Sequence, residues 1–357
     1  MKTLGFVGTA KNTGKTTTAL HMLELVAEKG IRTALTSIGY DGENTDHVTG
    51  LPKPRYFAKK SMVIATAEPC LKYGTAEYGV IQPTGLKTIL GEIMIAKVIS
   101  PGYVVLAGPN RKLDIIILLD LLREMDIQLT FLDGALNRLA AMVLADGMIL
   151  STGAAFDERI DVITDHAAAM ESLFHYPCHT PIEDRNEMVV NFRSNAGKVE
   201  QLPYSSVMDE ISMETVAGWL VSGTGGEVLI PGVFSPLLFQ LLLERYADKI
   251  SGTSFLFYSP LNLLASGNPL VWQSCFAKLK ELKCQISYIA PIPLHFITVN
   301  PFYPEYLQKT GNYNPAYVDK IRLLQVCREK IKTTPIVDIL QPPHPDLLSL
   351  CGIDHTL

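Results

Sequence analysis

The first half of the chain alternates short apolar runs with stretches whose apolar residues recur every three or four positions. The runs predict buried strands, and the recurrence predicts helices with one buried face. Strands are predicted at 3–7, 32–38, 62–65, 79–82, 92–98, 103–106, 128–132 and 148–151. Helices are predicted at 16–29, 112–125, 138–145 and 158–173. Apolar strands that alternate with helices are typical of a mostly parallel sheet covered on both faces.

The pattern breaks at 176–206, where prolines and polar residues interrupt the apolar runs. It resumes with strands predicted at 227–230, 254–258, 285–289, 295–299 and 335–340. Helices are predicted between them at 236–247, 269–282 and 316–331. We therefore predict an α/β protein with two domains, one at residues 1–180 and a smaller α/β domain of unknown role at residues 207–357.

The segment 8–16 reads Gly-Thr-Ala-Lys-Asn-Thr-Gly-Lys-Thr and joins the first predicted strand to the first predicted helix. Backbone N–H groups of such a loop point at phosphate oxygens, its lysine contacts the β- and γ-phosphates, and the next hydroxyl binds Mg²⁺. The usual spacing would put the first glycine at position 9, where this chain has Thr9. We predict a P-loop NTPase domain at residues 1–180. The expected nucleotide contacts are Gly8, Thr9, Lys11, Asn12, Thr13, Gly14, Lys15, Thr16 and Thr17.

A carboxylate that faces the magnesium ion is expected at the end of a neighbouring strand. Asp133 follows the predicted strand 128–132, and Asp41 follows the predicted strand 32–38. We predict that Thr16 and Asp133 bind Mg²⁺, and that Asp41 binds a second Mg²⁺ or positions water. Lys15, Asp133 and Asp41 are thus the expected catalytic residues. Aspartates are also common in turns and helix caps, so that role stays open for both.

Other polar residues near predicted strand ends suggest further contacts. Arg138, after Asn137, is placed to approach the γ-phosphate, although it would serve equally well in an ion pair at a helix start. The segment 151–154, Ser-Thr-Gly-Ala, follows a strand and is a candidate for contact with the base or ribose. Glu68 also follows a strand and is a candidate for contact with a substrate or partner.

Composition narrows the classes of partner. The net charge is −5 with no long basic block, so we expect no nucleic-acid partner. No apolar run approaches the roughly 20 residues of a spanning helix, so we expect no membrane segment. Six cysteines without a C-x-x-C pair indicate free thiols and a cytoplasmic location. His175, Cys178 and His179 form a possible metal cluster that lacks a fourth ligand.

The spacing of Gly8-Thr9 and Gly14-Lys15-Thr16 resembles the branch of P-loop proteins that includes dethiobiotin synthetase and the cobyrinic and cobyric acid synthases. The Asn-Lys-x-Asp motif with which GTPases read the base is absent, which favours ATP over GTP. Ala10 occupies the place where the partition and nitrogenase-iron-protein group has a second lysine, which argues against a lysine acting in trans.

Several short stretches resemble a narrower family, the P-loop subunit of the lysine 5,6-aminomutase reactivase. These stretches lie at 35–43, 65–68, 106–109, 132–138 and 151–154, so the resemblance covers the first half of the chain. It implies an ATP- and Mg²⁺-dependent chaperone of lysine degradation. Such a protein acts with a second, mismatch-repair-like ATPase subunit on an adenosylcobalamin-dependent aminomutase whose cobalamin is damaged. An oligomeric assembly is expected.

Two other classes of function stay open. A carboxylate ligase of the dethiobiotin or cobyrinic acid type would have a pocket for an acidic small molecule beside Lys15. A nucleotide-dependent metallochaperone or sensor would need no catalytic substrate site. A reactivating ATPase, in contrast, is expected to hydrolyse ATP slowly alone and faster with its partner.

Overall fold

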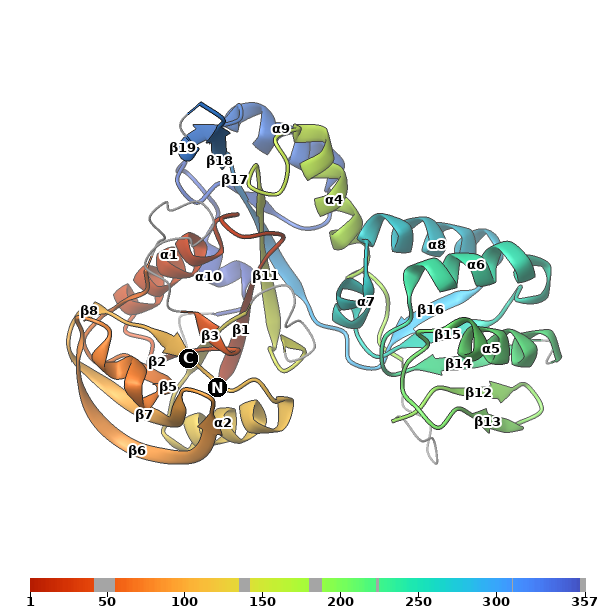
Figure 1. Ribbon diagram of the computed structural model, residues 1–357, viewed down its shortest axis with the longest axis horizontal. Helices are drawn as coiled ribbons and strands as arrows, with labels where there is room; N and C mark the ends of the chain where they lie inside the picture. Colours follow the sequence, from red (N-terminus) through yellow and green to blue (C-terminus); the bar gives the residue numbers. More distant parts are fainter. Residues whose placement is uncertain (42–54, 135–141, 180–187, 223–224, 310, 354–357) are drawn as a thin grey trace. The chain divides into compact units, whose positions relative to one another are not determined.

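The computed structural model describes residues 1–41, 55–134, 142–179, 188–222, 225–309 and 311–353 (Figure 1). They form an α/β protein with a large, mostly parallel sheet and a second, smaller mixed sheet. The chain divides into two compact units. One consists of Met1–Ala167 with Pro293–Leu357, and the other of Ala168–Ile292.

Nine strands form the sheet of the first unit, in the order β20-β17-β11-β1-β10-β2-β5-β7-β6. Neighbours from β20 to β5 run parallel, whereas β7 is antiparallel to both β5 and β6. The strands are β1 (Lys2–Gly8), β2 (Thr33–Ser37), β5 (Val63–Ala67), β6 (Glu77–Thr88), β7 (Gly91–Ser100), β10 (Leu129–Asp133), β11 (Gly147–Gly153), β17 (Leu294–Asn300) and β20 (Ile336–Val337). The predicted mostly parallel sheet is confirmed.

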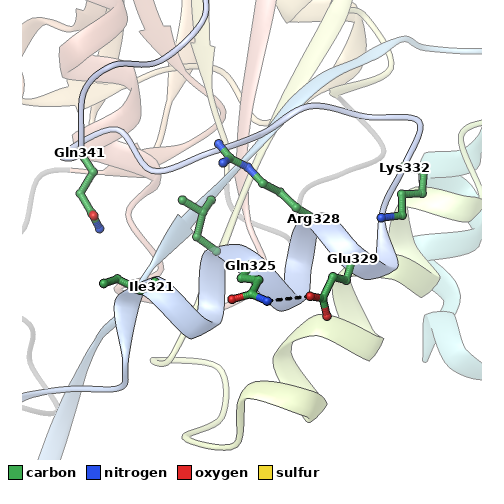
Figure 2. Close-up of a pocket in the computed structure, with 7 residues that line it drawn as sticks. Ile321, Gln325, Arg328, Glu329, Lys332 and Gln341 are labelled. Carbon is green, nitrogen blue, oxygen red and sulfur yellow. Dashed lines mark hydrogen bonds between the residues drawn. The ribbon is translucent and has the colours of Figure 1, made fainter.

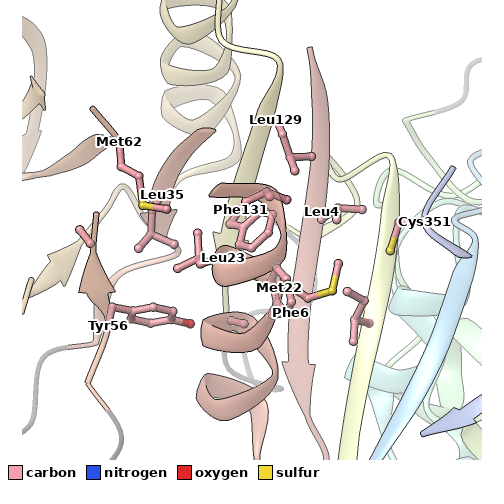
Figure 3. Packing of buried hydrophobic residues seen from close by; sticks show 14 of the residues in the cluster. Leu4, Phe6, Met22, Leu23, Leu35, Tyr56, Met62, Leu129, Phe131 and Cys351 are labelled. Carbon is pink, nitrogen blue, oxygen red and sulfur yellow. The ribbon is translucent and has the colours of Figure 1, made fainter. Parts of the chain in front are cut away.

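The main core of this unit lies between the central strands and helix α1 (Lys15–Glu28) (Figure 3). Phe6 of β1 and Phe131 of β10 pack with ring centroids 4.8 Å apart. Met22 and Leu23 cover them from one face of α1. Each such side chain, when fully buried, contributes about 1.5–3 kcal/mol to folding. This packing holds the start of α1 against the end of β1.

Further helices and short strand pairs complete the first unit. The helices are α2 (Lys112–Glu124), α4 (Ile160–Ser172), which contains the boundary with the second unit, α9 (Lys320–Lys330), α10 (Leu347–Leu350) and the 3₁₀ helix η1 (Glu68–Lys72). The strand pairs are β3 (Tyr40–Asp41) with β9 (Leu106–Ala107), β4 (Phe57–Ala58) with β8 (Gly102–Tyr103), and β18 (Phe302–Leu307) with β19 (Asn312–Tyr317).

The second unit is built on the sheet β13-β12-β14-β15-β16. The strands are β12 (Asn191–Ser194), β13 (Val199–Gln201), β14 (Gly226–Ile230), β15 (Ser254–Phe257) and β16 (Gln285–Tyr288). The helices are α5 (Glu210–Ser222), α6 (Pro236–Tyr246), α7 (Pro260–Ser266), α8 (Pro269–Glu281) and the 3₁₀ helix η3 (Ala247–Lys249). Its core centres on Trp272, whose ring contacts Phe239 and whose Nε1 donates to Leu263 O at 3.0 Å.

The unit boundaries differ from the predicted division at 1–180 and 207–357. Residues 293–357 return to the first unit, because β17 joins the large sheet beside β11, with Ile149 opposite Phe296 and Gly153 opposite Asn300. A parallel strand selects its neighbour through tertiary packing, and the apolar run at 294–300 carries no signal of which sheet it enters.

Some elements differ from the prediction, and others were not predicted. The strands predicted at 79–82 and 92–98 are present as β6 and β7, but both are longer than predicted and they pair antiparallel. Helix α5 went unpredicted because its apolar residues are spread around the helix and show no single stripe. The pair β18 and β19 was missed because each strand contains a proline, Pro304 or Pro315, a residue that argues against a strand. Most of the helix expected at 138–145 lies outside the described residues.

Among the described residues, no helix combines the length and the apolar character that crossing a bilayer requires.

Three half-buried histidines make the stability of the first unit sensitive to acid. Burial lowers the pKa of His21, His166 and His295 from the ordinary value of 6.5. The unfolded chain therefore takes up these protons first as the pH falls, so the free energy of unfolding decreases below pH 6.5 and is unaffected by these groups well above it.

We expect the melting temperature of the first unit to fall between about pH 7.5 and about pH 5.5, measured by calorimetry. His166→Phe preserves a ring for the contact with Phe156, whose centroid lies 4.2 Å away, and removes one titrating group. This variant should show a shallower fall with pH. A slope equal to that of the wild type would contradict the assignment for His166.

Candidate functional site

The segment between β1 and α1 forms a closed loop at the carboxyl end of the large sheet. Thr9 N donates to Ser151 O at 2.9 Å, which anchors the loop to the neighbouring strand β11. Thr13 Oγ1 donates to Ala10 O at 2.9 Å and closes the turn. Asn12 and Gly14 have positive φ values of 64° and 95°, so the backbone reverses its direction within a few residues. The result is a compact turn that leads directly into a helix N-terminus.

Glycine is required at position 8, the first position of this segment, because neighbouring atoms lie too close to leave room for a Cβ atom. A Cβ atom on Gly8 would lie 2.7 Å from Thr13 Oγ1 and 3.1 Å from Ala10 O. The loop therefore folds back over the end of β1, and no side chain fits between them. This observation gives a structural reason for Gly8, although it is one position earlier than the usual spacing.

Lys15 and Asp133 form the central ion pair of the site. Asp133 is the last residue of β10, which pairs with β1, and Lys15 is the first residue of α1. Lys15 Nζ lies 2.7 Å from Asp133 Oδ1. The Asp133 side chain is 0% exposed and that of Lys15 is 17% exposed, so the cation reaches the surface while its partner does not. Of the residues predicted to be catalytic, the structure brings these two together.

Hydroxyl groups link the start of α1 to the strands beside it. Thr18 Oγ1 lies 2.9 Å from Thr298 Oγ1, and Thr298 Oγ1 donates to Ser151 Oγ at 2.8 Å. All three side chains are buried. Thr9 Oγ1 donates to Thr152 Oγ1 at 3.2 Å on the loop side of this cluster. Ser151 and Thr152, predicted to contact base or ribose, thus support the loop through their side chains.

Asn300 is a residue of this site that was not predicted. Its Nδ2 donates to Asn12 O at 3.0 Å, and its Oδ1 accepts from Phe302 N at 3.2 Å. Its Cβ lies 3.3 Å from the position of a Cβ built on Gly14. Asn300 therefore supports the loop from the end of β17. Its position in the sequence, directly after a predicted strand, was the only available signal.

The structure says less about the other residues that were predicted to contact the nucleotide, the metal or a partner. Lys11 is exposed, and Thr16 and Thr17 are half-buried in the first turn of α1. Asp41 lies in the short strand β3, but its side chain falls outside the described part of the structure. Asn137 and Arg138 also lie outside the described residues. Glu68 is exposed at the start of η1.

The predicted cluster at 175–179 does not converge on one point. His175 Nε2 lies 2.6 Å from Glu171 Oε1, whereas His179 Nε2 lies 3.5 Å from Glu227 Oε2. Cys178 Sγ lies 3.8 Å from Ile289 O. Within the described ranges, no three His, Cys, Asp or Glu side chains come close enough to hold a metal ion.

Two surface cavities lie away from the loop. One, of about 360 Å³, is lined by residues of α9, among them Arg328, and by Lys332 and Gln341 (Figure 2). Arg328 Nη2 donates to Ile336 O at 3.0 Å, so its guanidinium is hydrogen-bonded to a backbone carbonyl of β20. The other, of about 420 Å³, lies between α6 and α8. Neither is lined by residues of the loop.

The site as a whole presents a helix N-terminus, a partly exposed lysine and a buried carboxylate at one edge of a parallel sheet. Strand β2, which follows β1 in the chain, lies on the β10 side of β1. Strand β11, which follows β10 in the chain, lies on the opposite side of β1. The loop therefore lies where the strand order reverses. Ligands of open α/β sheets bind at such a point. Comparison of the chain with models of protein families and with curated proteins finds no match.

Proposed function

We propose that this chain is a P-loop ATPase whose nucleotide cycle drives the reactivation of an adenosylcobalamin-dependent aminomutase. The observation that carries the nucleotide part is the ion pair between Lys15 and Asp133, 2.7 Å long, at the junction of loop and helix. The Asp133 carboxylate holds the Lys15 ammonium at this position, where an incoming anion would compete for it. The triphosphate is the anion that this geometry fits best.

Backbone groups add to the attraction for phosphate. The first intrahelical bond of α1 runs from Thr18 N to Gly14 O at 2.9 Å. The N–H groups of Thr16 and Thr17 precede it and have no acceptor within the helix. They point out of the helix end, where the macrodipole is equivalent to about half a positive charge. Phosphate oxygens would accept from them while Lys15 moves from Asp133 to the phosphates.

The oxygen donors beside the loop suit Mg²⁺. Thr16 contributes a hydroxyl and Asp133 a carboxylate, and Mg²⁺ prefers oxygen ligands of this kind. When bound, Mg²⁺ would neutralise charge on the phosphate oxygens during transfer. If the Lys15 side chain moves to the phosphates, the Asp133 carboxylate would become available to Mg²⁺. The role predicted for Asp41, to bind a second Mg²⁺ or to position water, stays a prediction.

The partner part of the proposal is supported by the sequence resemblance. Nucleotide hydrolysis does useful work only when the bound and hydrolysed states differ in affinity for something else. The stretches at 35–43, 65–68, 106–109, 132–138 and 151–154 resemble the reactivase P-loop subunit. This resemblance supports the proposal that the partner is an aminomutase, together with a second reactivase subunit.

A reactivation assay tests the proposal. An adenosylcobalamin-dependent aminomutase is inactivated by turnover and then mixed with this protein and fresh coenzyme, with the second subunit present or absent. We expect activity to recover with ATP and Mg²⁺, and not without ATP or with the Lys15→Ala variant. Recovery that is absent, or equal without ATP, would contradict the proposal. ATP consumption that depends on an added carboxylic acid would instead favour the ligase class.

A further inference from the structure

The hairpin formed by β18 and β19 carries an unusual face. Residues that are directly opposite in an antiparallel pair share a face, and every second residue along a strand joins them. One face of this hairpin therefore consists of three rungs that contain only aromatic residues and prolines. The rungs are Phe302 with Tyr317, Pro304 with Pro315, and Tyr306 with Tyr313.

This face is accessible and stiff. Tyr317 is 67% exposed and Tyr306 is 54% exposed. The rings of Phe302 and Tyr317 lie 5.8 Å apart, and those of Tyr306 and Tyr313 lie 5.1 Å apart. The prolines of the middle rung fix the local φ angles. The rings of these pairs are tilted against each other by 65° and 53°, so each exposed ring, held in place by its cross-strand contact, offers its own face to another π system.

The hairpin begins at the candidate site. Asn300 donates to Asn12 O in the loop and accepts from Phe302 N in the first rung, so one side chain joins loop and hairpin. Asn300 Cβ lies 3.3 Å from a Cβ built on Gly14. Phe302 follows Asn300 by two residues, so at most about 7 Å separates their Cα atoms. Figure 1 shows β18 and β19 beyond the carboxyl end of β17. The first rung thus begins two residues after the side chain that contacts the loop.

The position of the charged residues indicates on which side of the loop the base of a bound nucleotide would lie. The ion pair of Lys15 and Asp133 is on the β10 side of β1, where the terminal phosphates and Mg²⁺ are expected. The opposite side of β1 faces β11 and then β17, whose last residue is Asn300. A nucleotide with its terminal phosphates at Lys15 would therefore extend its base toward the root of the hairpin.

We propose that the rung formed by Phe302 and Tyr317 is the stacking platform for the base of the bound nucleotide. The inference rests on the proposed function, since it needs the triphosphate in the loop. Tyr317 is the more exposed ring and the main stacking surface, while Phe302 supports it from the side. The segment 151–154 then serves to hold the loop, and base binding comes from a part of the chain that was assigned no nucleotide contact.

Calorimetric titration with two ligands, MgATP and magnesium tripolyphosphate, tests this inference. Loss of one base–aromatic stack weakens binding by about tenfold, within a range of roughly 5- to 150-fold. We expect this loss for MgATP with Tyr317→Ala, and unchanged binding of tripolyphosphate, which has no base. Tyr317→Phe should bind both ligands like the wild type. Tyr306→Ala, on the rung farthest from Asn300, is the matched control and should change neither affinity.

The outcomes separate the inference from the function on which it rests. If the wild type binds neither ligand, the proposed nucleotide site itself fails. If the wild type binds both ligands and Tyr317→Ala retains full ATP affinity, the stacking platform is wrong while the phosphate site stands. Equal losses for ATP and tripolyphosphate would show that Tyr317 merely supports the loop. A loss in Tyr306→Ala as large as that in Tyr317→Ala would also overturn the assignment to the first rung.

Discussion

Replacing Lys15 with alanine should weaken MgATP binding by about 10- to 150-fold, because a hydrogen bond to a charged group contributes about 1.5–3 kcal/mol. Turnover should fall by about 100-fold or more, since a fixed positive charge at the transferring phosphate stabilises the transition state. Binding is measured by titration and turnover by phosphate release. Wild-type hydrolysis by a folded Lys15→Ala protein would contradict the phosphate-loop assignment.

The effect on folding must be separated from the effect on binding. Lys15→Ala removes the ion-pair partner of a carboxylate whose side chain is 0% exposed. Breaking a buried pair on one side costs up to about 3–5 kcal/mol of stability. The double variant Lys15→Ala with Asp133→Asn removes the charge as well. This double variant should be more stable than Lys15→Ala in thermal unfolding, but its ATP binding should stay as weak as that of Lys15→Ala. Recovery of both would show that Lys15 acts through the fold alone.

The sequence was most informative where the chemistry is local. The loop, Lys15 and Thr16 belong to one continuous segment, and the strand and helix that flank it were predicted to within a residue or two. Asp133 was placed correctly at the end of β10 because a buried strand is followed there by a glycine. Its ion pair with Lys15 was not predicted, although parallel strands that end at a common edge bring both residues to the same place.

What could not be predicted depends on tertiary pairing. Asn300 and Thr298 reach the loop only because β17 aligns with β11, and the intervening second unit hides this in the sequence. The same pairing moved 293–357 into the first unit. The hairpin that contains Phe302 and Tyr317 was not predicted, because its prolines suppress the strand signal. The support that Thr298 and Asn300 give the loop thus comes from a part of the chain that the resemblance does not cover.

The second large effect is expected for Asp133→Asn. This change keeps the shape of the side chain at the end of β10 and removes its negative charge. If Asp133 faces the metal, turnover that depends on Mg²⁺ should fall by about 100- to 1,000-fold, as for the loss of one strong electrostatic contact in an active site. Without Mg²⁺, however, ATP should bind the variant as tightly as the wild type or more tightly. The reason is that Lys15 no longer has to leave a carboxylate 2.7 Å away to reach the phosphates.

Opposite responses with and without the metal distinguish a metal-side carboxylate from a structural one, because damage to the loop would weaken ATP binding under both conditions. Asp146→Asn is the matched control. Asp146 accepts from Thr3 N at 2.7 Å near the start of β1, at the end of this strand opposite to the loop. Asp146→Asn should therefore not affect turnover. A large effect of Asp41→Asn together with normal turnover in Asp133→Asn would exchange the roles of the two aspartates. In that case the buried carboxylate would serve to hold Lys15 in the empty site, and the metal would be bound from the β3 side of the loop.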